Sequence, residues 1–365
     1  MRILVSTLCL SLLISTAATA KIVFAATHAD DANAVSIYVM EDDGMGVTPP
    51  LTTATYLTDP RWSPDGKQIV FSRPVHPKDW SRRQIVVMNV DGTNVRTLTA
   101  PLQHGMDDHP SFSPDGKSIL FTKFQSIDNK LQSCVCMIEL ETGKIKELSE
   151  LDVNFPDISP DGKHIVFSPI PILGKTGSNL WIMGADGHNP RELLPPLPKG
   201  ELLIDRVYAR WSPNGKQILY YQTENEYDAA KGFIPHAHRY FIYHLTTGQL
   251  RPLRIPKTYR SSGLDWMDNG KSIVFSAVEV KLKEPVDGVL HLYHLYKYQL
   301  ATGEITRLTA QPLLNPSLDW ISDDVFPVSP KGKHPTQWGK LKVLWPPVRE
   351  VLEGFTLNAF SLLYQ

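Results

Sequence analysis

The chain has 365 residues, a formal net charge of −1 at pH 7 and a pI near 6.9. This balance excludes the basic footprint of nucleic-acid-binding proteins, so we expect no nucleic-acid partner. The length fits either two domains of about 150 residues each or one large repeat architecture, and internal repeats decide between them.

Residues 1–20 have the pattern of a secretory signal. Arg2 supplies a positive start, an apolar run extends from Ile3 to Ile14, and Ala18-Thr19-Ala20 fits the small-x-small cleavage pattern. The apolar run is shorter than the roughly 20 residues that cross a bilayer. We therefore expect a cleaved signal, no transmembrane segment, and export to the periplasm or the cell exterior.

A turn motif, Ser-Pro-Asp-Gly-Lys or a close variant, recurs along the chain. Its glycines are Gly66, Gly116, Gly162, Gly215 and Gly270, which are 46 to 55 residues apart. Proline presets φ at the first turn position, Asp or Asn suits the second, and glycine accepts the left-handed conformation. An apolar run of β-branched and aromatic residues follows each copy. Each copy therefore predicts a hairpin turn and a buried strand, at the period of a propeller blade.

A second turn recurs in the same units. Its copies are Asp43-Gly44, Asp91-Gly92, Thr142-Gly143, Asp186-Gly187, Thr247-Gly248 and Thr302-Gly303. Each unit thus has four strands joined by two tight turns on one face, and its remaining two connections lie on the opposite face. This is the topology of a propeller blade.

The two ends of the repeat region complete one another. Lys21 to Phe24 match the second strand of a blade that lacks its first, and Asn315 to Trp320 match a first strand that lacks the rest. Pairing these ends closes the ring and leaves no free sheet edge. The sequence predicts an all-β fold, a six-bladed β-propeller of four-stranded antiparallel blades over residues 21–320, with one composite blade. We expect a monomer.

The repeats resemble those of the TolB family and of related WD-repeat-like propellers in exported bacterial proteins and some peptidases. The resemblance covers residues 21–320, and it implies the fold and a binding or scaffold role in the cell envelope. A full TolB carries an N-terminal α/β domain before its propeller. Here the propeller motifs begin where the predicted signal ends.

We place the candidate site on the face opposite the turns, because the connections predicted there are long and differ between units. They span residues 72–83, 122–132, 168–178, 221–239 and 276–289 within blades, and 99–109, 194–207 and 253–261 between blades. The candidate binding residues in them are His76, Trp80, Arg82, His104, Asp107, Asp108, His109, Tyr227, Asp228, His236, His238 and Arg239. Loops held by a rigid scaffold commonly carry function. We call this the long-loop face, and predict that it binds a protein, peptide or glycan partner.

The alternative is an enzyme of the oligosaccharide lyase or lactonase type. In it, His104, His109, His236 and His238 would hold a divalent metal, as histidines do in propeller lyases that act on pectin fragments. However, twelve histidines in a chain of this length give chance groupings, and we favour their interpretation as solvated loop residues. The sequence therefore predicts no catalytic residue and no cofactor.

Other chemistry-bearing patterns have simpler explanations. The sequence contains no Gly-x-Ser-x-Gly and no His-Glu-x-x-His motif. Cys134 and Cys136 are two apart in a strand-like segment, where Cα atoms are roughly 6.5 Å apart, near the limit of disulfide geometry. We interpret them as small buried hydrophobic side chains. The recurring tryptophans Trp62, Trp211, Trp266 and Trp320 are expected to pack between blades.

Beyond Trp320 the repeat pattern ends. Residues 321–365 are predicted to be a C-terminal tail, with a basic linker over residues 331–342. Apolar residues from Val348 to Leu362 recur near helical spacing and predict a short amphipathic helix.

Overall fold

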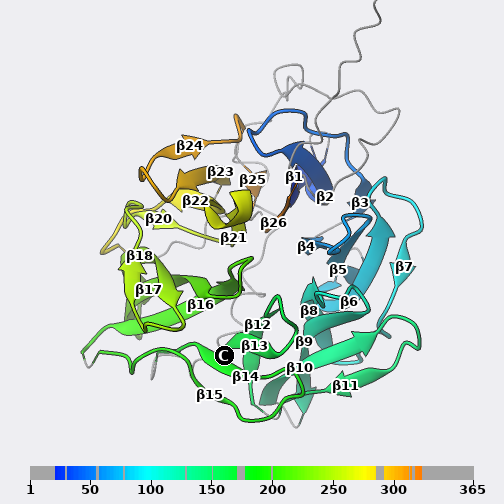
Figure 1. Cartoon of the computed structure of the whole chain (residues 1–365), viewed down its shortest axis with the longest axis horizontal. Helices are drawn as coiled ribbons and strands as arrows, with labels where there is room; N and C mark the ends of the chain where they lie inside the picture. Colours follow the sequence, from blue (N-terminus) through cyan, green and yellow to red (C-terminus); the bar gives the residue numbers. More distant parts are fainter. Residues whose placement is uncertain are drawn as a thin grey trace, which may run out of the picture.

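The computed structural model describes residues 21–322, except 29–30, 55–56, 77–78, 128–129, 150, 171–176, 199, 285–291, 312 and 315–316. Six antiparallel sheets surround a central axis (Figure 1). The predicted six-bladed propeller is therefore confirmed. The predicted signal and nearly all of the predicted tail lie outside the described residues.

The blades are numbered here from the composite one, with the innermost strand first. Blade 1 contains β26 (Leu318–Ile321), β1 (Lys21–His28), β2 (Asp31–Glu41) and β3 (Thr52–Ala54). Blade 2 contains β4 (Thr58–Trp62), β5 (Gln68–His76), β6 (Asp79–Asn89) and β7 (Arg96–Thr97). Blade 3 contains β8 (Gly105–Phe112), β9 (Ser118–Ile127), β10 (Lys130–Glu139) and β11 (Ile145–Glu147).

The other three blades follow in chain order. Blade 4 contains β12 (Val153–Ile158), β13 (His164–Pro169), β14 (Trp181–Gly184) and β15 (Arg191–Glu192). Blade 5 contains β16 (Leu203–Trp211), β17 (Gln217–Asp228), β18 (Gly232–His244) and β19 (Leu250–Pro252). Blade 6 contains β20 (Tyr259–Arg260), β21 (Leu264–Met267), the 3-10 turn η1 (Asp268–Gly270), β22 (Ser272–Glu279), β23 (Leu292–Gln299), β24 (Ile305–Arg307) and β25 (Leu313–Leu314).

The ring closes through blade 1, as predicted. β26 pairs antiparallel with β1, with Lys21 opposite Ile321 and Phe24 opposite Leu318. Figure 1 shows the orange C-terminal strand beside the blue N-terminal strands. The two ends of the propeller thus hold one sheet together, so that separating them would expose sheet edges.

The Ser-Pro-Asp-Gly turns close through side-chain hydrogen bonds. In blade 2, the Ser63 hydroxyl donates to Asp65 Oδ1 at 2.7 Å and the Lys67 N–H donates to the same oxygen at 3.1 Å. Gly66 has a φ of 68°, which glycine adopts without strain. These contacts confirm the predicted turn, because they fix the chain reversal within five residues.

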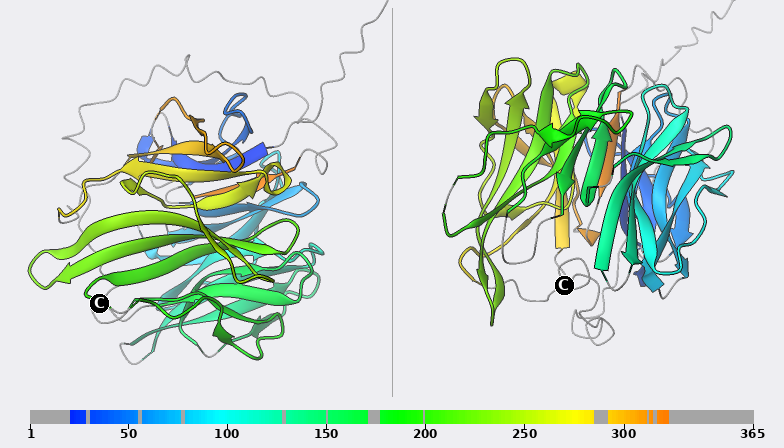
Figure 2. Two further views of the ribbon diagram at one scale, coloured as in Figure 1. Left: turned by 60° about the vertical axis from the view of Figure 1, so that its left-hand side comes forward. Right: turned by 90° about the horizontal axis from the view of Figure 1, so that it is seen from below.

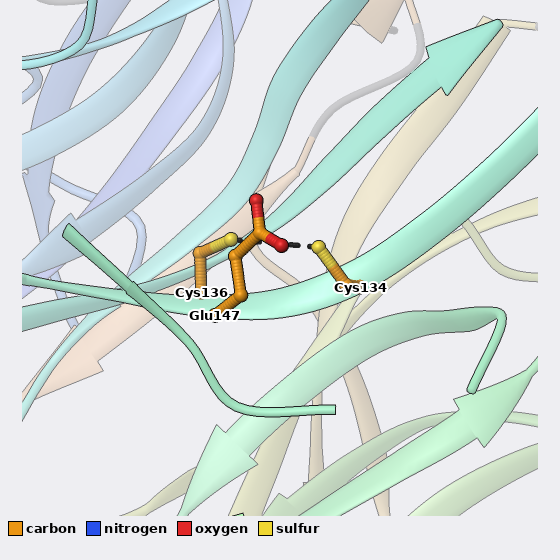
Figure 3. Close-up of side chains that lie close together, drawn as sticks. All are labelled: Cys134, Cys136 and Glu147. Carbon is orange, nitrogen blue, oxygen red and sulfur yellow. Dashed lines mark hydrogen bonds between the residues drawn. The ribbon is translucent and has the colours of Figure 1, made fainter. Parts of the chain in front are cut away.

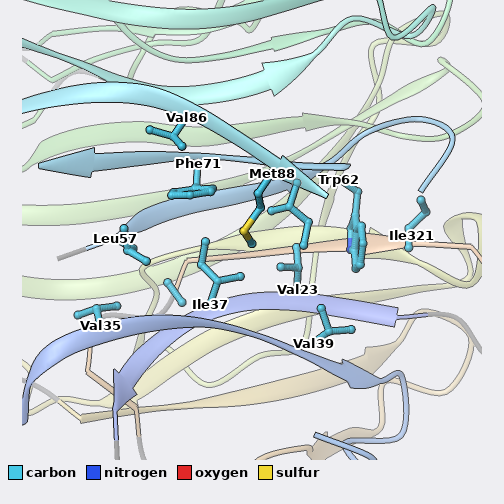
Figure 4. Packing of buried hydrophobic residues seen from close by; sticks show 12 residues of the cluster. Val23, Val35, Ile37, Val39, Leu57, Trp62, Phe71, Val86, Met88 and Ile321 are labelled. Carbon is cyan, nitrogen blue, oxygen red and sulfur yellow. The ribbon is translucent and has the colours of Figure 1, made fainter. Parts of the chain in front are cut away.

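The core consists of six apolar clusters, one between each pair of neighbouring blades. Between blades 1 and 2, Trp62 lies against Val23 and Ile321 (Figure 4). The equivalent Trp211, Trp266 and Trp320 lie in three of the other clusters, as predicted from their spacing. Each blade is therefore stabilised chiefly by its neighbours, as in other repeat folds.

Three of the predicted long loops were wrong. Their described residues belong mostly to long paired strands, in which His76 is opposite Asp79, Ile127 is opposite Lys130 and Asp228 is opposite Gly232. In the longest, β17 reaches Asp228 and β18 begins at Gly232. Figure 2 shows this hairpin extending beyond the neighbouring blades.

Cys134 and Cys136 are free thiols. Cys136 is buried between blades 2 and 3, whereas Cys134 is only partly buried. In the described part of the chain, no helix has the length and apolar character needed to cross a bilayer.

Candidate functional site

Four of the innermost strands carry a bulge whose left-handed residue lies three residues before the last residue of the strand. Register shifts occur in β4, β8, β12 and β16, and each bulge holds one residue with left-handed φ: Asp59 at 51°, His109 at 52°, Phe155 at 53° and Tyr208 at 55°. Residues other than glycine lose about 1–3 kcal/mol in such backbone, and they cluster at functional sites. The repeated strain therefore directs attention to this level of the channel.

These residues occupy equivalent positions, seven residues before the turn glycine of each blade. Gly263 holds this position in blade 6, and Ser317 holds it in blade 1, three residues before Trp320. All six line one small pocket, whose volume is about 10 Å³ for water-sized occupants. Each inner strand runs from the long-loop face towards the turns, and this ring lies within or directly before those strands. We call it the channel mouth, because it is nearer the long-loop face than is the ion-pair layer around Arg61.

One side of the mouth is an arc of aromatic rings from three consecutive blades. The ring centroids of His109 and Phe155 are 4.2 Å apart, and those of Phe155 and Tyr208 are 4.3 Å apart. The planes are tilted by 55° and 53°. The arc therefore offers ring edges and faces at different angles rather than one flat platform.

Acidic groups lie beside the arc. His109 Nε2 is 3.9 Å from Asp59 Oδ2, and His109 Nδ1 is buried without a hydrogen-bond partner among the described residues. Ligand atoms of Asp59, Asp108 and His109 lie within 4.8 Å of one another, close enough for a metal ion. Burial raises the pKa of Asp59, against the opposing charge of His109.

Asp108 already has partners that compete with a metal. One of its oxygens is ion-paired with Arg83, and the other accepts hydrogen bonds from Thr58 Oγ1 and the His109 N–H, both at 3.1 Å. Burial alone would raise the pKa of Asp108, but Arg83 and His109 lower it to about 2. The carboxylate is thus stabilised by an internal cation, which a metal would have to displace.

An ion-pair layer lies two residues deeper along the same strands. Arg61 of blade 2 is buried, and its guanidinium contacts Asp319 at 2.9 Å, Asp157 at 3.2 Å and Asp265 at 3.8 Å. These carboxylates come from blades 1, 4 and 6, so Arg61 reaches across the channel axis. The layer closes the channel beneath the mouth.

The same carboxylates tie neighbouring blades together. Asp319 accepts the N–H of Trp62 at 2.7 Å, and Asp157 accepts the N–H of Trp211 at 2.9 Å. Burial raises the pKa of Asp265 well above its ordinary value, and the nearby charge of Asp319 raises it further. We interpret this layer as structural, because its carboxylates are paired with Arg61 or with backbone N–H groups of neighbouring blades. Arg210 belongs to the same layer, and its Nε has no hydrogen-bond partner among the described residues.

Several predicted site residues lie away from the mouth. His76 lies at the exposed end of β5, Arg82 Nε donates to the Leu102 carbonyl at 2.8 Å, and His104 is exposed before β8. The backbone of Trp80 lies in β6, and its side chain is outside the described part. Of the predicted residues in blades 2 and 3, only Asp108 and His109 belong to the mouth.

Asp107 points away from the mouth into the body of blade 3. It is 3% exposed, and its Oδ1 has no hydrogen-bond partner among the described residues. Burial raises its pKa to about 6, against a hydrogen bond with Thr99.

The predicted residues of blade 5 belong to the long hairpin. Tyr227 packs edge-on against Phe233, and Asp228 caps the hairpin turn by accepting the N–H groups of Ala230 and Lys231. His236 Nε2 is 3.1 Å from Glu226 Oε2, and Arg239 Nε donates to Glu224 Oε1 at 2.6 Å. These side chains are paired along the hairpin.

His238 is buried at the base of this hairpin. Its Nδ1 lies 2.6 Å from the Tyr221 hydroxyl, and burial lowers its pKa to about 3, with a further contribution from Arg260. The imidazole is therefore neutral at physiological pH. Among the described residues, His238, His236 and His104 do not join the metal-capable group that contains His109.

Sequence reasoning missed most of the mouth and the layer beneath it. Asp59, Phe155, Tyr208 and Arg61 were absent from the candidate residues. One signal would have found the first three: at one position, three residues before the recurring Trp, Phe or Ile of each inner strand, the six units carry Asp, His, Phe, Tyr, Gly and Ser. A position that is structurally equivalent in all repeats but carries a different side chain in each is not required for the folding of the blades.

Comparisons with known proteins agree with this architecture. The chain is 28% identical over 172 residues to the uncharacterized peptidase YuxL of Bacillus subtilis, a match covering 38% of this chain and 25% of that protein. The chain therefore matches about a quarter of the length of this curated relative.

Solved structures give a wider match to the fold. TolB from Acinetobacter baumannii superposes with a TM-score of 0.61 at 17% identity, covering 83% of this chain and 67% of TolB. Oligogalacturonate lyase in complex with manganese gives a TM-score of 0.51 at 13% identity, covering 78% of each chain. At such identities the similarity shows the fold alone. The TolB beta propeller domain family matches residues 15–202, about half of the chain, and the chain therefore belongs to this family.

Proposed function

We propose that this protein is an exported, non-catalytic binding module of the cell envelope that holds a peptide segment of a partner protein at the channel mouth. The observation that carries the proposal is the aromatic arc of His109, Phe155 and Tyr208, held in left-handed backbone around the pocket. Backbone strain of this kind persists only where the surrounding structure imposes it, and it clusters at binding sites.

The chemistry of the mouth favours a basic side chain as the anchor. Aromatic faces attract a cation by about 0.5–2 kcal/mol. His109 of blade 3 lies between the Phe155 ring of blade 4 and the Asp59 carboxylate of blade 2, so the arc has a negative charge at one end. Arg61 and Arg210 also line the pocket, and Asp157 and Asp319 offset their charge. The pocket has room for about one water molecule, so the cation lies at the rim of the arc and the rest of the peptide lies across that rim.

A peptide fits this geometry better than a glycan. Sugar rings stack on flat aromatic surfaces, whereas neighbouring rings of the arc are tilted by more than 50°. Bulged strands also present backbone groups outside the sheet ladder, and such groups can pair with an extended peptide.

Site-specific photo-crosslinking in cells tests the proposal. A photoreactive phenylalanine analogue replaces Phe155 in one variant and Lys163 in a second, because Lys163 is exposed on the turn face of the same blade. We expect an envelope protein to crosslink at position 155 and not at 163, with the crosslinked peptide containing Lys or Arg. Crosslinking from position 163 alone, or to glycan at 155, would contradict the proposal.

Binding measurements with the identified partner then test the arc. Truncating an aromatic anchor costs about 2 kcal/mol or more at binding hot spots, which is roughly a 30-fold loss of affinity. We expect Phe155→Ala to lose that much, and Tyr227→Ala, which removes an exposed hairpin ring, to bind like the wild type.

A metal-dependent enzyme is the second candidate function. The grouping of Asp59, Asp108 and His109 favours it, and the Arg83 ion pair on Asp108 opposes it. Elemental analysis of the purified protein beside His109→Ala and His104→Ala variants distinguishes the two functions. About one divalent ion per chain that is lost only in His109→Ala would support the enzyme, and metal content unchanged between the variants would remove it.

A further inference from the structure

A second group of potential ligands lies on the outer strands of blade 3 and contains no residue of the channel mouth. Cys134 and Cys136 point to the same side of β10, and Glu147 of β11 lies against them (Figure 3). Cys136 is directly opposite Glu147 in the register of the two strands. Regular strand pairing therefore holds all three side chains together.

The two sulfur atoms already have the spacing of metal ligands. Cys134 Sγ and Cys136 Sγ are 3.6 Å apart. Two thiolates bound at about 2.3 Å in a tetrahedral site are about 3.8 Å apart, whereas two thiolates on opposite sides of an ion would be about 4.6 Å apart. The sulfur spacing thus fits tetrahedral coordination with little movement.

Glu147 supplies a third ligand atom. One of its carboxylate oxygens, together with the two sulfurs, forms a group in which all atoms lie within 4.8 Å of one another. Its Oε1 also accepts a hydrogen bond from Lys123 Nζ at 2.7 Å. A carboxylate can bind an ion through one oxygen and keep such a partner on the other, and outer-shell partners of this kind orient metal ligands.

Charge and access are both favourable. With two thiolates, one carboxylate and Lys123, the net charge of the group is −2, which a divalent ion neutralises. The Glu147 side chain is 56% exposed, so an ion can enter from solvent and a water molecule can complete the tetrahedron.

We propose that Cys134, Cys136 and Glu147 form an open binding site for a borderline divalent cation, Zn²⁺, on blade 3. Thiolates favour zinc over calcium and magnesium, and the carboxylate together with the short sulfur spacing favours it over Cu(I). The site is independent of the channel mouth.

Metal titration of the purified, reduced protein tests this site. Cd²⁺ is the spectroscopic probe, because it binds thiolates and gives an ultraviolet charge-transfer band, and Zn²⁺ is added as the competitor. A thiol count on each sample before titration ensures that both cysteines are reduced. We expect one Cd²⁺ per chain with a thiolate band, and stoichiometric displacement by Zn²⁺.

Variants identify the ligands. Loss of a direct ligand should weaken binding by more than the roughly 10–100-fold seen when an outer-shell partner is lost. We expect Cys134→Ser to lose the band and Glu147→Gln to weaken Cd²⁺ binding at least about tenfold while keeping the band. Glu141→Gln changes an exposed turn glutamate of the same blade and should bind like the wild type.

The substituted positions were chosen so that loss of metal binding can be distinguished from loss of folding. Cys136 is buried in the core between blades 2 and 3, so its substitution can disturb the fold, whereas Cys134 and Glu147 are partly or largely exposed. The absence of a thiolate band in the reduced wild type would overturn the proposal. Equal Cd²⁺ affinity in the wild type, Cys134→Ser and Glu147→Gln would overturn it as well, as would preference for Cu(I) that Glu147→Gln leaves unchanged.

Discussion

Aspartates of the turns and aspartates of the interior serve opposite purposes in this propeller. At the turns, the neighbouring serine hydroxyls and lysine N–H groups lower the pKa values of Asp115 and Asp161. On the inner strands, burial raises the pKa values of Asp107, Asp157 and Asp265. Turn aspartates are stabilised as anions where they stand, whereas the interior ones need a cation or a proton from elsewhere.

The contrast between turn and interior aspartates distinguishes contacts that every blade repeats from contacts that are particular to this chain. Every Ser-Pro-Asp/Asn-Gly turn closes on itself through local contacts, so it can be copied from blade to blade. The interior acids depend on partners from other blades, such as Arg61 on β4. A group of this kind exists only once in the ring, and changing one member affects several blades.

The largest expected effect comes from removing the central cation. Arg61→Met removes the guanidinium that contacts all three carboxylates and leaves Arg210 as the remaining cation beside them, and breaking a buried ion pair from one side costs about 3–5 kcal/mol. Lys67→Met removes an exposed basic residue of the turn and should change the free energy of unfolding by less than about 0.5 kcal/mol. Urea unfolding at pH 7 measures both, and equal effects would show that the ion-pair layer is not structural.

Asp107→Asn should stabilise the protein at neutral pH. The pKa of Asp107 is about 6 when folded and 3.8 as the ordinary value, so the folded state binds its proton more tightly. Its ionisation therefore costs stability as pH rises from about 4 to 6, by about 2–3 kcal/mol in total, since one pKa unit is about 1.4 kcal/mol. Asn removes that loss.

The pH dependence provides the control for this variant. At pH 4 the carboxyl is largely protonated in the fold, so the wild type and Asp107→Asn should differ little in free energy of unfolding. At pH 7.5 the variant should be the more stable one. A variant that is less stable at pH 7.5 would mean that the carboxylate has a favourable partner when ionised.

The two turn glycines of blade 4 should differ in tolerance. Gly162 and Gly187 both have positive φ, so alanine at either costs about 1–2 kcal/mol. A Cβ at Gly162 meets nothing within 4 Å, whereas a Cβ at Gly187 would overlap the Leu148 carbonyl oxygen of the preceding blade. We expect Gly187→Ala to be less stable than Gly162→Ala by about 1–3 kcal/mol, as measured by thermal and urea unfolding. Equal losses would mean that blades 3 and 4 separate readily at this contact.

The sequence predicted the fold well because the fold depends on the repeated, local contacts. Proline, aspartate and glycine at each turn determine the hairpins, and the pairing of Lys21–Phe24 with a C-terminal strand follows from the missing strand at each end. Strand length was less predictable. Residues 221–239 were read as a loop, because a hairpin that projects from a blade has polar side chains like those of a loop.

The mouth was predictable only in part, because its residues come together across blades. His109 and Asp108 were chosen from their loop position, but His236 and His238 lie in the blade 5 hairpin, where His238 is paired with Tyr221. Glu147 joins Cys134 and Cys136 through the register of β10 and β11. No local pattern in the sequence contains that register.

Phe155→Gly should have a small effect on stability and a large effect on partner binding. Phe155→Gly removes a left-handed φ that costs about 1–2 kcal/mol, and it also removes ring contacts with His109 and Tyr208 worth about 0.5–1.5 kcal/mol each. Glycine also loses more backbone entropy on folding, about 0.5–1 kcal/mol. These terms oppose one another, so the free energy of unfolding should change by no more than about 1–2 kcal/mol.

Crosslinking and affinity for the partner should nevertheless fall sharply in Phe155→Gly, whereas Phe155→Tyr should keep both. If Phe155→Gly lost several kcal/mol of stability, the aromatic arc would be part of the fold, like the tryptophans between the blades. If it kept both stability and binding, the strain at the four bulges would have no connection with the partner. Only stability retained together with binding lost identifies the mouth as the region where the chain departs from its repeat in order to bind.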